Sequence, residues 1–171
     1  IMPHGLFLFV FMERHTSRIT FNRQPELDAH PSPLNSRGCL NQHCWDKLGD
    51  MAYVLDQYGP YRIGVTGSAV DPIGMPITDL WRDATINLNA SATKWYTVAA
   101  DPSLGVVRFF VKYLSDTGTR PTRAFVFHVE SKSWWEEEYP FEIGGACLSL
   151  LAGTMRLLVG AENEAIYQTY S

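Results

Sequence analysis

Short apolar runs, each followed by a polar turn, recur along the whole chain and predict strands rather than helices. The run "GLFLFVF" (5–11) leads to "RITFN" (18–22), "MAYVLD" (51–56) to "YRIGV" (61–65), and "KWYTVAAD" (94–101) to "VVRFFVKY" (106–113). Likewise "RAFVFHV" returns as "WWEEEYPF", and "ACLSLLA" as "MRLLVGA". Two β-rich runs around a Gly, Pro, Ser or Asp turn are typical of an antiparallel hairpin. Helical periodicity is almost absent, and only residues 77–84 are expected to form one or two turns.

The spacing of these hairpins favours an all-β fold of propeller-type blades. The hairpins at 94–113 and 123–140 together give a four-stranded unit of roughly 45 residues, which is the size of one blade. A blade buries both faces against its neighbours, which explains continuous apolar runs such as "AFVF". The Pro- and Gly-rich segments 23–50 and 66–92 are expected to be long connections. A β-sandwich and a barrel are the alternatives.

The length predicts one β-rich domain over residues 1–171. A hydrophobic share of 46% and a charged share of 19% indicate a globular chain, and 13% aromatic residues supply large side chains for packing between sheets. This length holds about three to four blades, whereas propellers have about four to eight. We therefore expect an incomplete ring, completed by further residues of a longer polypeptide or by another chain, or an open stack of sheets.

The charge and hydropathy exclude some partners. A net charge of −4 and a pI near 5.7 argue against nucleic acid, whose binding surfaces are normally basic. No apolar run reaches the roughly 18 residues of a membrane span. Four arginines near the start of the chain, Arg14, Arg18, Arg23 and Arg37, form a candidate contact strip for a partner, with a solvated face as the alternative.

The motifs of common enzymes and cofactor sites are missing from the sequence. It contains no HExxH, no G-x-S-x-G and no phosphate loop, so neither catalytic residues nor a cofactor are predicted. Cys39, Cys44 and Cys147 lack a second Cys/His pair at zinc-ligand spacing and are expected to be reduced and metal-free. The segment "RGCLNQHCW" (37–45) is interpreted as a structural plug between blades, in which Asn41 and Gln42 satisfy backbone groups.

The hairpin at 123–140 carries two tryptophans followed by three glutamates. Trp134 and Trp135 point to opposite faces of a strand, so one of them is expected to pack inward, while stacking of either on a ligand such as a sugar is the alternative. Three consecutive glutamates, 136–138, cannot converge on one bond, because neighbouring residues alternate between faces. They are interpreted as a solvated or edge-protecting acidic strand rather than as a glycosidase pair.

Three sets of residues in the loop and hairpins resemble one protein family. The first set is Arg37, Gly38, Cys39, Asn41, Gln42 and Trp45; the second is Val54, Asp56, Gly59 and Tyr61; the third is Arg123, Ala124, Glu130, Trp134, Trp135, Glu137, Tyr139 and Pro140. In this order they resemble the β-propeller-bearing tail or connector proteins of tailed bacteriophages. The resemblance extends over roughly residues 5–170.

The resemblance implies a structural component of the virus particle, in its tail or tail-connecting region, without enzyme activity or cofactor. Its expected partners are other virion proteins and further copies of itself in a ring about the tail axis. Its expected location is the virion, assembled in the host cytoplasm. Two alternatives remain open at this point: a carbohydrate-binding or glycosidase-like propeller that recognises host glycan, and a cellular propeller adaptor.

Overall fold

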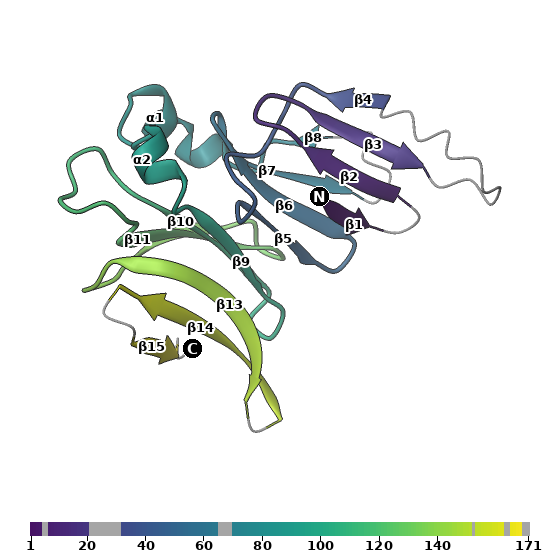
Figure 1. Cartoon of the computed structure of the whole chain (residues 1–171). Helices are drawn as coiled ribbons and strands as arrows, with labels where there is room; N and C mark the ends of the chain where they lie inside the picture. The colour runs from purple at the N-terminus through teal and green to yellow at the C-terminus, as the bar shows by residue number, and fades with distance from the viewer. Residues whose placement is uncertain (5–6, 21–31, 65–69, 152, 163–164, 169–171) are drawn as a thin grey trace.

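The chain folds into four antiparallel sheets that follow one another along the sequence (Figure 1). The computed structural model describes residues 1–4, 7–20, 32–64, 70–151, 153–162 and 165–168. The first sheet contains β1 (Met2–His4), β2 (Phe7–Phe11), β3 (Thr16–Thr20) and β4 (Ser32–Asn35). The second contains β5 (Trp45–Leu48), β6 (Met51–Asp56), β7 (Gly59–Gly64) and β8 (Val70–Asp71). The third contains β9 (Thr97–Asp101), β10 (Val106–Val111), β11 (Arg123–His128) and β12 (Trp134–Glu138), and the fourth β13 (Ile143–Leu151), β14 (Thr154–Ala161) and β15 (Ile166–Gln168).

Within every sheet the strands are ordered as they are in the sequence, so each sheet is a simple meander. The hairpins predicted at 51–65, 94–113 and 123–140 are confirmed, and the last two join into one four-stranded sheet. Two of their turns depend on glycines with positive φ, Gly59 at 106° and Gly105 at 65°. The predicted all-β class, with antiparallel blade-like sheets, is therefore confirmed.

Helix is confined to the connection between the second and third sheets. It consists of a 3₁₀ turn η1 (Met75–Ile77), α1 (Thr78–Arg82) and α2 (Ala90–Thr93). The short helical turn expected within 77–84 is thus confirmed as α1. Among the described residues, none of the helices has the length and apolar character that crossing a membrane would require.

Three strands of the third sheet, β9, β10 and β11, are buried on both faces, whereas its edge strand β12 is partly exposed. All described side chains of β9 and β10 are buried, in agreement with the continuous apolar runs of the sequence. One face packs in a core shared with the first and second sheets, through Phe109 and Phe127 among others. The other face packs on Ile143, Leu157 and Val159 of the fourth sheet. Burial on both faces is what a central blade requires.

Three short strands lie in segments that the sequence suggested were connections. β4 and β5 fall within 23–50, and β8 falls within 66–92. β4 contains Pro33, which a strand tolerates at a sheet edge, and β4 is the edge of its sheet. β5 carries Asp46 and Lys47, so its composition lacks a strand signal, and pairing with β6 fixes its conformation. Tertiary pairing, not local propensity, makes these strands.

Candidate functional site: a cleft beside the fourth sheet

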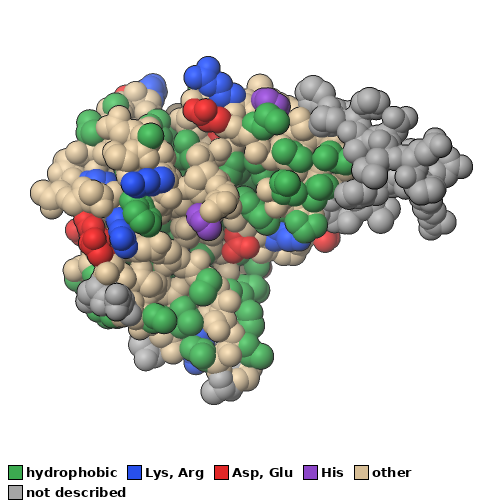
Figure 2. Space-filling model, viewed as in Figure 1, with side chains coloured by type: hydrophobic (Ala, Val, Ile, Leu, Met, Phe, Trp, Pro, Cys, Tyr) green, Lys and Arg blue, Asp and Glu red, His purple; other side chains and the backbone are tan. Residues whose placement is uncertain are grey.

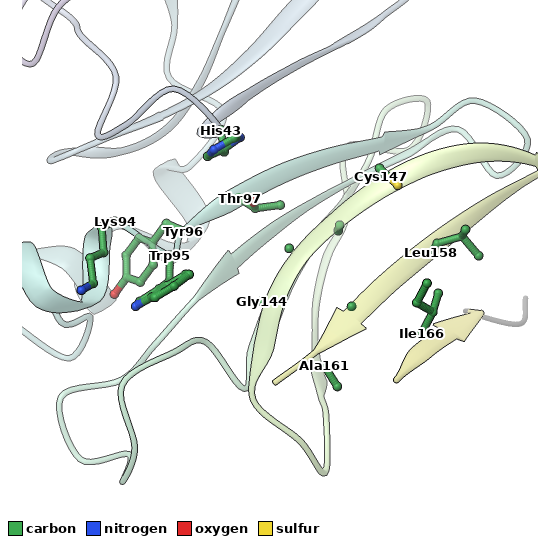
Figure 3. A pocket seen from close by; sticks show the side chains of 13 residues that line it. His43, Lys94, Trp95, Tyr96, Thr97, Gly144, Cys147, Leu158, Ala161 and Ile166 are labelled. Atoms are coloured by element: carbon green, nitrogen blue, oxygen red, sulfur yellow. The ribbon is translucent and has the colours of Figure 1, made fainter. Parts of the chain in front are cut away.

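The first strands of the second, third and fourth sheets lie side by side, and a cleft opens next to them (Figures 1 and 3). The cleft has a volume of about 570 Å³. Its walls come from the segment before β9, from β13 and β14, and from the loop that leads into β5. The lining residues are His43, Lys94, Trp95, Tyr96, Thr97, Gly144, Gly145, Ala146, Cys147, Leu158, Gly160, Ala161 and Ile166.

The floor of the cleft is backbone, because glycines face each other on two paired strands. Gly145 of β13 lies opposite Gly160 of β14 in the register. A Cβ atom added to Gly145 would meet nothing within 4 Å. Glycine in a strand often marks a place where another backbone or a ligand approaches closely. The described part of the chain leaves this position open.

The aromatic wall of the cleft is Trp95, whose ring lies near two cations, and one of these, Arg120, is also 3.9 Å from the Glu162 carboxylate. The Arg120 guanidinium lies 4.2 Å from the centre of its ring and the Lys94 ammonium 5.3 Å from it. His43 adds an imidazole at the rim, and the described lining contains no carboxylate. The cleft thus offers an apolar surface with positive charge at its edge, which suits an apolar or aromatic group beside a negative charge.

The loop 37–45 positions His43 and links three sheets, as the predicted plug should. The Asn41 amide donates to the carbonyl oxygens of Thr93 at 2.6 Å and Tyr96 at 2.9 Å. The Asn41 side-chain oxygen accepts the backbone N–H of His43 at 2.6 Å, and the His43 carbonyl accepts the N–H of Val98 at 2.9 Å. The plug interpretation is confirmed for Asn41. The Gln42 side chain instead is exposed and lies 3.0 Å from the His43 ring nitrogen Nε2.

The two cysteines of this loop are buried thiols. Burial raises the pKa of Cys39 to about 12, and burial also raises the pKa of Cys44 well above its usual value. Cys147, by contrast, is exposed and lines the cleft. Among the described residues no group of three or more His, Cys, Asp or Glu side chains is arranged to hold a metal ion.

The arginines of the predicted contact strip have different environments. Arg14 is exposed in the turn between β2 and β3, and Arg18 is half-buried in β3. Arg23 lies outside the described residues. Arg37 is bound within the chain: its Nε and Nη2 donate to both oxygens of buried Asp56, and Nη2 donates to the Gly59 carbonyl at 3.0 Å. A partner contact at this strip stays a prediction, but the guanidinium of Arg37 already has internal acceptors.

The tryptophan pair divides between the two faces of β12. Trp134 packs inward, 4.9 Å from the ring of Phe127, and its Nε1–H donates to the Ile73 carbonyl at 3.1 Å. Trp135 is 42% exposed. The expectation that one tryptophan packs inward is confirmed, and Trp135 is the one that a ligand or partner can reach.

The three glutamates are not equivalent, and the interpretation of all three as solvated is wrong for Glu137. β12 is indeed the edge of its sheet. However, Glu137 accepts hydrogen bonds from Arg108 at 2.9 and 3.2 Å and from the Tyr139 hydroxyl at 2.7 Å. Burial raises the pKa of Glu137, but these hydrogen bonds outweigh it and leave the pKa below its usual value. A general acid needs a raised pKa, so Glu137 has the wrong shift for that role.

The cleft and most of its lining were not predicted from the sequence. Lys94 and Trp95 were expected only as part of a strand, and Gly144 and Gly145 were considered only as a phosphate loop, which they do not form. One signal was available, because two adjacent glycines at the start of a strand are unusual and point to close backbone approach. The other residues come from segments about 50 residues apart, as with His43 and Tyr96, and only the packing of the sheets brings them together.

Comparisons with known proteins identify the fold but no family. No protein-family model matches the sequence, and no curated protein matches it either. Among solved structures, the extracellular domain of a putative one-component system from B. thetaiotaomicron matches with a TM-score of 0.59 and 13% identity. The match covers 99% of this chain and 20% of that one, so the chain spans about a fifth of the length of this neighbour.

Proposed function

We propose that the chain is a structural component of a tailed bacteriophage particle, in the tail or tail-connecting region, that acts through protein–protein contacts and not by catalysis. On this proposal it resides in the virion and binds other virion proteins and further copies of itself about the tail axis. The residues that carry the resemblance support this, because they brace sheets. Arg37 ties loop 37–45 to Asp56 of the second sheet, and Asn41 ties it to α2 and to Tyr96, which directly precedes the third sheet. Trp134 ties the third sheet to Ile73, two residues after the last strand of the second.

The observation that carries the proposal is the apolar surface of the fourth sheet. Large apolar side chains there are exposed: Leu150 at 64%, Leu151 at 41%, Met155 at 38%, Ile166 at 71% and Tyr167 at 41%. The hairpin of β13 and β14 extends away from the other sheets, and hydrophobic side chains gather along it (Figure 2). Leu150 and Met155 are cross-strand partners on one face of this hairpin, and exposed apolar surface of this kind on a folded chain marks an interaction site.

Incorporation into particles tests the proposal directly. Particles are purified from the producing culture on a density gradient, and their proteins are quantified by mass spectrometry. Peptides of this chain are expected at a constant ratio to the other particle proteins across the gradient peak. Peptides that are missing, or that follow abundant host proteins instead of the peak, would refute a virion role.

A matched pair of variants tests the exposed apolar surface of the fourth sheet, on which the proposal depends. Leu150 and Met155 are cross-strand partners on the projecting hairpin, so changing both to serine removes apolar contact area while leaving the rest of the sheet intact. We expect at least a tenfold loss of incorporation. Met75→Ser changes an apolar side chain that is 68% exposed in η1, and it should incorporate normally. Equal incorporation of both variants would exclude the hairpin as the contact surface.

A further inference from the structure

The glycine floor of the cleft belongs to the face of the fourth sheet that the third sheet leaves uncovered. In the register, Gly145, Gly160 and Ile166 form one row across β13, β14 and β15. Neighbouring residues of a strand point to opposite faces, so Leu157 and Val159 belong to the other face, and these two pack against the third sheet. The cleft is therefore a hollow on the outside of the fourth sheet and not a gap within its core.

This floor is shaped for a flat group. The face toward the third sheet carries large side chains such as Leu157, whereas two of the three residues in the floor row are glycines. A Cβ atom on Gly145 would meet nothing within 4 Å, so the described part of the chain leaves the space above the floor unfilled. Bare backbone accepts a planar ring at close range, with Trp95 as an aromatic wall and Leu158 as an apolar one. The volume of about 570 Å³ is in the range of small-molecule sites.

Two cations lie at the Trp95 end of the cleft. Lys94 is exposed, and no ion pair among the described residues includes it. Arg120 stacks on Trp95 and reaches the floor, because a Cβ atom on Gly144 would lie 3.1 Å from its Nη1. The Arg120 Nε is buried, and within the described part of the chain it has no hydrogen-bond partner. An anion at this end meets a free ammonium and a guanidinium that is only partly paired.

The carboxylates near this end do not neutralise the two cations. Glu162 is 56% exposed and lies 3.9 Å from Arg120, which is beyond hydrogen-bond distance. The Glu142 carboxylate is turned toward the loop before β11, where it accepts the Thr119 N–H at 2.9 Å. The described residues therefore leave positive charge beside an aromatic wall and a bare floor, and this combination suits an aromatic anion.

The last strand of the fourth sheet leads away from these cations. Ile166 lies opposite Gly160 and Gln168 lies opposite Leu158, so β15 runs from the Gly160 end of the cleft to the Leu158 end. Figure 3 shows Leu158 at the end of the cleft away from Trp95. Within the described residues, β15 therefore brings no carboxylate to the cations, and this end of the cleft is left to a separate molecule.

We propose that the cleft binds a small aromatic carboxylate. The ring of the ligand lies flat on the backbone of Gly145 and Gly160, beside Trp95. Its carboxylate pairs with Lys94 and Arg120. This inference goes beyond the proposed structural role, because the hairpin tip that is proposed to contact other virion proteins is not part of the cleft lining.

Calorimetric titration of the purified 171-residue chain tests the site with three probes that share one ring. Cinnamate is the anion, cinnamamide is its neutral isostere, and cinnamylamine is a cation of similar size. Two unit charges about 4 Å apart in water interact by about 1 kcal/mol, which is roughly a fivefold change in affinity. We expect cinnamate to bind at least about fivefold more tightly than cinnamamide, and cinnamylamine to bind more weakly than either.

Variants with a matched control locate the site. Gly145→Leu fills the floor at a position where the described chain leaves room, so the fold should be retained while cinnamate binds at least about tenfold more weakly. Lys94→Gln should weaken cinnamate about fivefold and change cinnamamide less than about twofold. Lys132→Gln removes the charge of an exposed lysine in the turn after β11, and it should change neither affinity by more than about twofold.

Several results would overturn the inference. Equal affinity for cinnamate and cinnamamide would exclude an anion site, and no heat of binding at about 1 mM probe would exclude the site altogether. Cinnamate binding that survives Gly145→Leu would place the probe elsewhere, on the exposed hairpin if changing both Leu150 and Met155 to serine abolishes it. If Gly145→Leu loses its cooperative urea unfolding, the comparison of Lys94→Gln with its control decides. Incorporation into particles should be normal for Lys94→Gln, so the virion role and this inference fail separately.

Discussion

Among the three glutamates of β12, Glu137 is expected to contribute most to stability. Its side chain is 27% exposed and that of Arg108 is 5% exposed, so the pair lies largely out of water. Glu137→Gln removes the negative charge and replaces one of the two acceptor oxygens with an NH₂ group. This group is a donor, and it faces the donor N–H groups of the Arg108 guanidinium. A hydrogen bond to a charged group contributes about 1.5–3 kcal/mol and a neutral one about 0.5–1.5 kcal/mol. We expect the free energy of unfolding to fall by about 2–3 kcal/mol, below the roughly 3–5 kcal/mol of a fully broken buried pair.

The adjacent residue supplies the control. Glu138→Gln removes the same charge from the same strand, but the Glu138 side chain is 68% exposed and pairs with Arg123 at 3.2 Å. An exposed pair contributes about 0.2–1 kcal/mol. Urea unfolding at pH 7, followed by circular dichroism, compares the two variants. A difference between them below about 0.5 kcal/mol would refute the assignment of Glu137 to a buried pair.

A double variant separates loss of the pair from loss of packing. Arg108→Met combined with Glu137→Leu replaces the ion pair with apolar side chains, which is often neutral or stabilising for a buried pair. The double variant should therefore lose less than the sum of the two single effects, although Arg108→Met also takes a cation from buried Asp101, 3.9 Å away. If it instead loses the sum of the two single effects, Arg108 and Glu137 are not energetically coupled.

Three further outcomes are expected. The pKa of Glu137 is lowered in the folded chain, so its contribution to stability is present above the unfolded pKa of about 4.3 and is lost as the pH falls through the folded value. The difference in unfolding free energy between wild type and Glu137→Gln should therefore be constant from pH 7 to about 5 and shrink in acid. A difference that grows in acid would contradict the lowered pKa. Asn41→Ala removes one donor from each of two carbonyls, those of Thr93 and Tyr96, and should cost about 1–3 kcal/mol in urea unfolding. Asn89→Ala, exposed and without a capping bond, should cost under about 0.5 kcal/mol, and equal costs would remove Asn41 as a brace. Ellman's reagent should modify only Cys147 in the folded chain and all three thiols in denaturant, since the other two cysteines are buried; rapid reaction of more than one thiol in the native chain would show that loop 37–45 opens.

Much of the candidate site could not be read from the sequence. The cleft joins His43 to Trp95 and to the glycines of β13, and no local pattern relates these segments. The sequence also does not tell which of the two adjacent tryptophans is exposed, because contacts with distant segments such as Ile73 cover Trp134 and leave Trp135 exposed. By contrast, the brace formed by Asn41 was visible in advance, because an amide-rich loop between apolar strands has to satisfy backbone groups from its own side chains.

The sequence by itself determined the strands and their turns. Apolar runs such as 106–111 and 123–128, separated by Gly and Pro turns, allow few conformations other than antiparallel hairpins, since side-chain alternation and positive-φ glycines act over a few residues. The tertiary structure alone decided which charge is buried and which tryptophan is exposed. Glu137 and Glu138 are identical in the sequence and adjacent on one strand, but they point to opposite faces, and only the packing of neighbouring sheets places Arg108 next to one and water next to the other. Burial depends on contacts between segments that are distant in the chain, and that information is not local.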